Sequence, residues 1–258
     1  MTSLAELQER RAHACRLTPD RALDTLDEAE DFLRERGLLT RMPDCSLPSL
    51  FAACHEEPYK PGAGGFGEWP RTKWPWSFEL EERPGVYALK VHRGKTLYVA
   101  DEVARLLDPI CRAEIARMEE ADEAWARLLR HLGDAGPSLV EDIRTELDLA
   151  PRELKALRAP LERCGAVVSR LLVLETAGGG HVHGSELARW DQAYLHPAAA
   201  EPDLGALVAA AVHAAVVVPE REPGGWFSWT WRWEEDLVER LVAQGRLARP
   251  EPGWLAAA

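Results

Sequence analysis

Residues 136–189 read GPSLVEDIRTELDLAPRELKALRAPLERCGAVVSRLLVLETAGGGHVHGSELAR, and this stretch decides the fold class. Apolar residues at helical spacing predict a short helix over residues 139–147, with Ser138 as its N-cap and Glu141 completing a capping box. A second helix is expected from Pro151, which suits a first helical turn, to Gly165, which suits the position after a helix. Two β-prone runs around a glycine-rich tip then predict a hairpin.

Another helix is expected just before this stretch. Apolar residues recur at helical spacing between Trp125 and Leu132, and Gly133 is expected to end that helix. Three helices followed by a hairpin is the element order of a winged helix-turn-helix, which would cover about Asp122 to Trp190. The alternative is a helical hairpin beside an unrelated β-ribbon.

The pattern of an amphipathic helix, a glycine and a β-prone run containing arginine occurs near Gly37, Gly165 and Gly245. Three such matches predict a repeated module, although three ordinary helix-to-strand joints would give the same pattern. The expected fold class is mainly α with small β-hairpins, arranged as tandem winged helix-turn-helix modules. Their expected boundaries are 1–121, 122–195 and 202–258, and HPAAAEPD at 196–203 reads as a linker.

The N-terminal module is expected to contain an inserted loop rich in Trp, Gly and Pro, followed by a hairpin. VYALKV and TLYVA predict two strands with a turn around Arg93-Gly94, and a long helix is expected from about Asp101 to Met118. The hairpin would be the wing of the first module, displaced by the loop.

Composition limits the function classes. The formal net charge of −12 disfavours a nucleic-acid partner, although a DNA-binding face can be local. Neither a signal peptide nor a membrane span is expected, and the longest apolar run contains His213. Five scattered cysteines without a C-x-x-C pair favour a reducing, cytoplasmic location.

Two basic clusters are candidates for contacts with DNA. One lies on the helix that begins at Pro151, where a recognition helix would carry its contacts, and the other is interleaved with tryptophans of the loop and the hairpin. An ordinary solvated helix face and a loop anchored by Trp74 and Trp76 are the structural alternatives. The candidate nucleic-acid-binding residues, wing tip included, are Arg152, Lys155, Arg158, Arg71, Lys73, Arg93, Lys95, His181 and His183.

No metal or cofactor is expected. His181 and His183 could bind a metal from one strand face, but two histidines without a third ligand make an incomplete site. The chain contains no phosphate loop, no G-x-G-x-x-G, no G-x-S-x-G and no H-E-x-x-H motif, so common nucleotide-dependent enzymes and hydrolases are not supported.

The chain resembles the AlkZ/YcaQ superfamily of winged-helix DNA glycosylases. The resemblance rests on the three-module order, on RGLLTRMPDCSLPSLFAACHE, on the Trp-rich loop and on the YALKVHRGK hairpin, and it covers most of the chain. It implies tandem winged helices that bind double-stranded, damaged DNA and excise alkylated or crosslinked bases.

The sequence departs from this superfamily at the catalytic motif. The family carries Gln–aliphatic–Gln or Gln–aliphatic–acid after a Gly-Leu-Leu-like segment, whereas residues 38–44 read LLTRMPD, without Gln. Excision needs a group that positions water or stabilises a cationic sugar. Asp44 and Glu56 are the candidates for this catalytic role, and excision itself stays open.

Two non-catalytic functions remain as alternatives to a glycosylase-like DNA-binding protein. A winged-helix fold does not by itself determine function, so the protein could instead be a scaffold that binds a protein partner. The net negative charge and the Trp-rich C-terminus favour this alternative. A transcription regulator would be expected to form dimers with two recognition helices one DNA turn apart.

Overall fold

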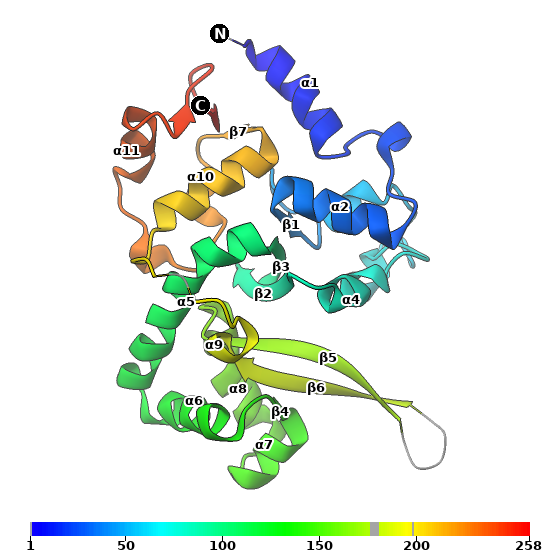
Figure 1. The fold of residues 1–258 in the computed structure, drawn as a ribbon. Coiled ribbons are helices and arrows are strands. Elements are labelled where there is room, and N and C mark those ends of the chain that lie inside the picture. The colour runs from blue at the N-terminus through cyan, green and yellow to red at the C-terminus, as the bar shows by residue number, and fades with distance from the viewer. Residues whose placement is uncertain (1, 176–180, 198) are drawn as a thin grey trace.

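The computed structural model describes the backbone of residues 2–175, 181–197 and 199–258, and the side chains of these residues except 174–175 and 181–183. In this part the chain is mainly helical with three small antiparallel sheets (Figure 1). The expected mainly α class with small β-hairpins is therefore confirmed. Among the described residues, no helix is both long enough and apolar enough to cross a membrane.

The N-terminal unit, which comprises the elements from α1 to β3, contains the predicted hairpin. His92 pairs with Lys95 across the turn, and Arg93 and Gly94 both have positive φ, 52° and 77°, as a two-residue hairpin turn requires. Strand β3 lies between β1 and β2. The elements are α1 (Leu4–Ala14), α2 (Leu26–Arg36), β1 (Leu38–Thr40), α3 (Leu50–Ala53), α4 (Trp76–Glu79), β2 (Val86–His92) and β3 (Lys95–Ala100), with 3₁₀ turns at Pro19–Arg21, Gly65–Glu68 and Leu80–Glu82.

Helix α5 (Asp101–Ala121) joins the N-terminal unit to the rest and carries two buried carboxylates. Asp108 accepts a hydrogen bond from the indole nitrogen of Trp190 at 2.8 Å. Glu114 lies 2.7 Å from the guanidinium of Arg232. Trp190 belongs to the central unit and Arg232 to the C-terminal unit. Helix α5 therefore contacts both units through hydrogen bonds of its carboxylates as well as through its apolar face.

The central unit comprises the elements from α6 to α9, and its hairpin β5–β6 extends away from the body of the molecule (Figure 1). Strand β6 lies between β4 and β5. The predicted helix from Pro151 to the turn at Gly165 is confirmed. The elements are α6 (Glu123–Ala135), β4 (Ser138–Leu139), α7 (Val140–Glu146), α8 (Pro151–Arg163), β5 (Val167–Glu175), β6 (His181–Arg189) and α9 (Trp190–Ala193).

Two local predictions in the central unit are wrong. Ser138 does not cap a helix; it pairs with Leu187 in β6, and its hydroxyl donates to the carbonyl of Gly136. Helix α6 continues past Gly133 and ends at Ala135, with Gly136 as its C-cap. The first error has a non-local cause, because Ser138 joins a strand through pairing with a residue far along the chain that local spacing cannot reveal.

The C-terminal unit, from α10 to β9, packs its tryptophans inward. Trp226 and Trp229 are buried, and the indole of Trp229 donates to the carbonyl of Cys164 at 2.9 Å. Trp231, by contrast, is 51% exposed. Strand β9 lies between β7 and β8. The elements are α10 (Leu204–Ala215), β7 (Val217–Pro219), α11 (Leu237–Ala243), β8 (Leu247–Ala248) and β9 (Trp254–Ala257), with 3₁₀ turns at Pro223–Gly225 and Thr230–Arg232.

The same strand order, first–third–second, occurs in each of the three described sheets. One equivalence suggested by the sequence is wrong, however. Gly165 and Gly245 precede the second strand of their sheets, whereas Gly37 precedes the first strand. Gly136 and Val216 stand at the places that correspond to Gly37, so the match at Gly37 is an ordinary helix-to-strand joint. One buried apolar cluster includes residues of all three units, such as Leu97, Leu129 and Val212.

Candidate functional site

A hollow of about 530 Å³ lies beside the loop that follows β1. Met42, Asp44, Glu56, Glu68 and Lys95 are among its lining residues, and we call it the Asp44 hollow. A second hollow of about 320 Å³ shares four of these residues and is also lined by His92. The structure thus brings both predicted catalytic carboxylates to one concave surface of the size that small ligands occupy.

Asp44 is surrounded by basic side chains. Its Oδ2 lies 2.5 Å from the Lys95 ammonium, and its Oδ1 lies 2.9 Å from His92 Nε2 and 3.6 Å from the Arg93 guanidinium. Partial burial acts to raise the pKa of Asp44, but the hydrogen bonds from Lys95 and His92 outweigh it and hold that pKa below its ordinary value. Asp44 is therefore ionised at neutral pH, which suits stabilisation of a positive charge and not proton donation.

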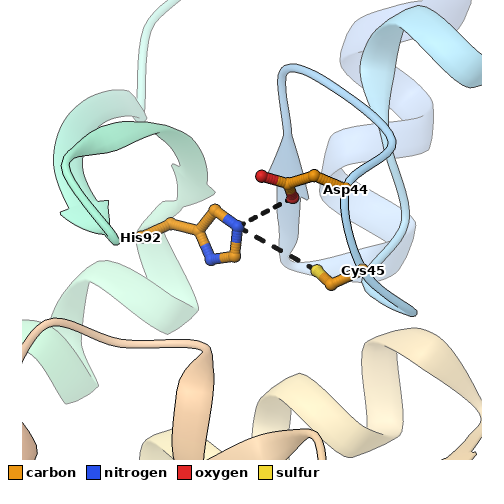
Figure 2. Close-up of side chains that lie close together, drawn as sticks. All are labelled: Asp44, Cys45 and His92. Carbon is orange, nitrogen blue, oxygen red and sulfur yellow. Dashed lines mark hydrogen bonds and ion pairs between the residues drawn. The ribbon is translucent and has the colours of Figure 1, made fainter.

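His92 stands at the end of β2 and is buried. Its Nδ1 lies 2.7 Å from the carbonyl oxygen of Trp226, so the C-terminal unit fixes the orientation of the ring. Its Nε2 faces Asp44, and the Cys45 Sγ lies 4.0 Å from the same nitrogen. Figure 2 shows the three side chains converging, with Asp44 and Cys45 on one loop and His92 on the hairpin.

Glu56 lines the Asp44 hollow, but both of its carboxylate oxygens accept hydrogen bonds from the inserted loop. Its Oε1 accepts from the backbone N–H and the hydroxyl of Thr72 at 2.8 and 2.6 Å, and its Oε2 accepts from the backbone N–H of Lys73 at 3.0 Å. Burial acts to raise the pKa of Glu56, but these hydrogen bonds lower it below its ordinary value. The carboxylate therefore holds the inserted loop in place.

Tryptophans of the inserted loop pack against neighbouring phenylalanines and against the N-terminal core. Trp69 and Trp74 both contact Phe66 and Phe78. Trp76 packs against the buried cluster that contains Phe32 and Leu50. Trp74 and Trp76 thus anchor the loop, as the structural alternative expected.

The predicted nucleic-acid-binding residues of the N-terminal unit fall into two groups. Arg93 and Lys95 flank Asp44 on the hairpin, and Arg71 is exposed on the loop. Lys73 is half-buried: its ammonium donates to the carbonyl of Leu23 at 2.5 Å and lies over the ring of Trp76. Lys73 thus contributes to the anchoring of the loop.

The predicted residues of α8 are more accessible. Arg152 and Lys155 are exposed and Arg158 is half-buried, and within the described residues none of the three has an ion pair. The side chains of His181 and His183 lie outside the described ones. Their backbone belongs to β6, where His183 pairs with Val173.

Helix α8 packs against the hairpin that carries His92. Lys90 in β2 forms an ion pair with the buried Glu162 at 2.7 Å, and the Arg163 side chain lies directly over Gly94. The C-terminal end of the candidate recognition helix thus adjoins the hairpin turn that flanks Asp44. This contact between units was not predictable from either segment alone.

Sequence reasoning missed Cys45 and Glu81, and it placed His92 in the basic cluster of the hairpin without predicting its contact with Asp44. Glu81 lines a hollow of about 250 Å³ between the N-terminal and central units, together with Tyr87 and Trp190. Burial raises the pKa of Glu81 to about 7. No motif marks these residues; for His92 the one available signal was its place beside the predicted hairpin turn.

Comparisons with known proteins identify a similar fold. No protein-family model matches the sequence, and a search of curated proteins finds no match. Among solved structures, Streptomyces sahachiroi DNA glycosylase AlkZ aligns with 99% of this chain and 70% of its own, with a TM-score of 0.54 and 12% sequence identity. The chain therefore shares its overall fold, over nearly its whole described length, with a DNA glycosylase.

Proposed function

We propose that this protein binds double-stranded DNA through tandem winged-helix units and belongs to the glycosylase-like group of such proteins. The observation that carries the proposal is the fold shared with a DNA glycosylase over 99% of the chain. The repeated strand order supports a winged helix in each unit, because a wing hairpin pairs there with a short first strand. The boundaries that we propose are 1–121, 122–195 and 202–258.

In this proposal α8 is the recognition helix of the central unit and supplies phosphate contacts. Arg152 and Lys155 are exposed cations that are free of ion pairs within the described residues, and phosphate contacts need such groups. Arg93 and Lys95 would extend this basic surface to the Asp44 hollow. An acidic chain can bind DNA in this way, since salt-dependent affinity depends on the local charge of the face in contact.

DNA binding is tested by fluorescence anisotropy with a labelled duplex over a range of salt concentrations. Arg152→Ala and Lys155→Ala should each weaken binding and reduce the salt slope by about 1. Arg10→Ala removes a charge from α1, in another unit, that is likewise exposed, and should leave the slope unchanged. Absence of salt-dependent binding by the unaltered protein at low ionic strength would contradict the proposal.

Base excision would take place in the Asp44 hollow. Asp44 is the proposed catalytic carboxylate, because its low pKa keeps it negative where a departing base would leave a cationic sugar. Glu56 has the supporting role of fixing the loop that walls the hollow. The hollow is the part of the molecule on which an extruded base could be held.

Excision is tested by release of free base from a panel of alkylated duplexes. Asp44→Asn should abolish release without weakening duplex binding, and Glu56→Gln should reduce it less. Release that is unchanged in Asp44→Asn would remove this site assignment. If the unaltered protein binds duplex DNA but releases no base, it is a non-catalytic DNA-binding protein. If it neither binds duplex DNA nor releases base, the protein-binding scaffold is favoured.

A further inference from the structure

The side chains of Asp44, Cys45 and His92 offer three different donor atoms at one point. One carboxylate oxygen, the thiol sulfur and the imidazole nitrogen all lie within 4.8 Å of one another. Aspartate oxygen, cysteine sulfur and histidine nitrogen are the donors that zinc(II) takes in proteins, and three protein ligands with an open fourth position are typical of reactive zinc sites. We propose that this cluster binds a divalent transition-metal ion, with zinc(II) as the best match to the donors.

The hydrogen bonds of His92 support this assignment. The carbonyl of Trp226 can only accept, so the nitrogen 2.7 Å away, Nδ1, carries a hydrogen and donates. Nε2 lies 2.9 Å from the Asp44 carboxylate, which can only accept, so either a proton stands between the two atoms, as in the hydrogen bond described above, or a metal ion takes the place of that proton. Metal-binding histidines are oriented in the same way, with the second ring nitrogen donating to a backbone carbonyl.

The surroundings allow the small adjustments that an ion requires. With bonds of roughly 2.0–2.3 Å, tetrahedral donors lie roughly 3.3–3.8 Å apart. The distance from His92 Nε2 to Asp44 is 2.9 Å and that to Cys45 is 4.0 Å, so each must change by less than an ångström. Asp44 lies on a loop, and the cations now paired with it, Lys95 and Arg93, are 56% and 43% exposed and can move into water.

An ion at this point would connect two units of the fold. Asp44 and Cys45 belong to the loop after β1, and His92 is attached to the backbone of the C-terminal unit at Trp226. Ser46, which follows Cys45, donates from its backbone N–H and from its hydroxyl to Glu222 of the C-terminal unit, both at 2.9 Å. A bound ion should therefore stabilise the contact between the N-terminal and C-terminal units and raise the melting temperature.

The test uses the full chain, stripped of metal with a chelator and titrated with cobalt(II) and with zinc(II). We expect about one ion per chain, a cobalt spectrum with a thiolate charge-transfer band, and a melting temperature that rises with added zinc(II). Cys45→Ser should lose the charge-transfer band and bind zinc(II) more weakly by at least about tenfold. Cys54→Ala, which removes another thiol of the same unit, should keep the band.

Asp44→Asn removes a second proposed ligand and should also weaken zinc(II) binding. Absence of binding by the unaltered chain would overturn the proposal. So would zinc(II) binding and cobalt(II) spectra of Cys45→Ser and Asp44→Asn that equal those of the unaltered chain, and the contact between Asp44 and His92 would then be a hydrogen bond without a metal. Because no DNA is present in this titration, its failure is distinguishable from failure of the proposed function.

Discussion

Asp44 has a charge environment that controls its chemistry. Three cationic or hydrogen-bonding side chains meet its two oxygens, while the neighbouring thiol of Cys45 has its pKa raised to about 11 by burial. At neutral pH the pair is therefore a carboxylate beside a neutral thiol. At this scale the candidate site is set up for electrostatic stabilisation, and a nucleophilic thiolate is disfavoured.

The lowered pKa of Asp44 predicts a pH dependence of stability. A carboxyl group whose pKa is lower in the folded than in the unfolded chain contributes stability above its unfolded value, 3.8, and that contribution is lost as the pH falls through the folded pKa. In urea denaturation, Asp44→Asn should be less stable than the unaltered protein at pH 7. The difference should shrink below about pH 4. A difference that is constant between pH 7 and pH 3 would contradict the lowered pKa.

At the scale of elements, the joints between helices and strands depend on glycine for two separate reasons. Gly165 and Gly245 both have positive φ, 77° and 67°. A Cβ added to Gly165 would lie 2.6 Å from the sulfur of Cys111, whereas one added to Gly245 would meet nothing within 4 Å. At Gly245, backbone conformation alone requires glycine. At Gly165, both backbone conformation and close packing against α5 require it.

The two joints therefore predict different costs for the same substitution. Gly245→Ala should lower the free energy of unfolding by about 1–2 kcal/mol, the cost of a left-handed alanine. Gly165→Ala should cost roughly 2–5 kcal/mol, because overpacking adds to that cost. Urea denaturation of the two variants measures the difference directly. Equal losses would show that the contact with Cys111 relaxes freely.

At the scale of the whole molecule, buried charges on α5 connect the units. Glu114 is fully buried and binds Arg117 at 2.6 Å and Arg232 at 2.7 Å. Arg232 lies in a 3₁₀ turn of the C-terminal unit, so this ion pair spans the contact between α5 and that unit. The Glu114 carboxylate is buried from solvent, whereas the Arg232 guanidinium is partly exposed. Removal of Arg232 therefore leaves the buried negative charge of Glu114 less well compensated.

This contact predicts a large difference between two arginines of one unit. Arg232→Ala should lower the free energy of unfolding by about 2 kcal/mol, since it removes a charged hydrogen bond from the buried Glu114 but leaves its ion pair with Arg117. Arg240→Ala, which removes an exposed partner of Glu234 and Asp236, should cost less than about 1 kcal/mol. Thermal unfolding, with limited proteolysis to detect release of the C-terminal unit, provides the measurement. Similar losses for both variants would mean that α5 does not anchor this unit through Glu114.

Features that depend on a few neighbouring residues were predictable from the amino-acid sequence. The helix from Pro151 to Gly165, the turn at Arg93-Gly94 and the long helix after Asp101 all follow from local backbone preference and hydrophobic period, and all are present in the structure. The sequence did not predict that Asp44 and Glu56 line the same hollow. The path of the inserted loop, which lies between Glu56 and the hairpin in the sequence, could not be predicted.

Which distant residues contact one another depends on how the units pack in three dimensions. Ser138 became a strand residue because Leu187 pairs with it, and Asp44 meets His92, 48 positions away, because β1 and β2 flank β3 in one sheet. The ring of His92 is in turn fixed by Trp226, 134 positions further along the chain. Such contacts form between segments brought together by packing of the shared core, so no local pattern at Asp44, Cys45 or His92 could encode their convergence.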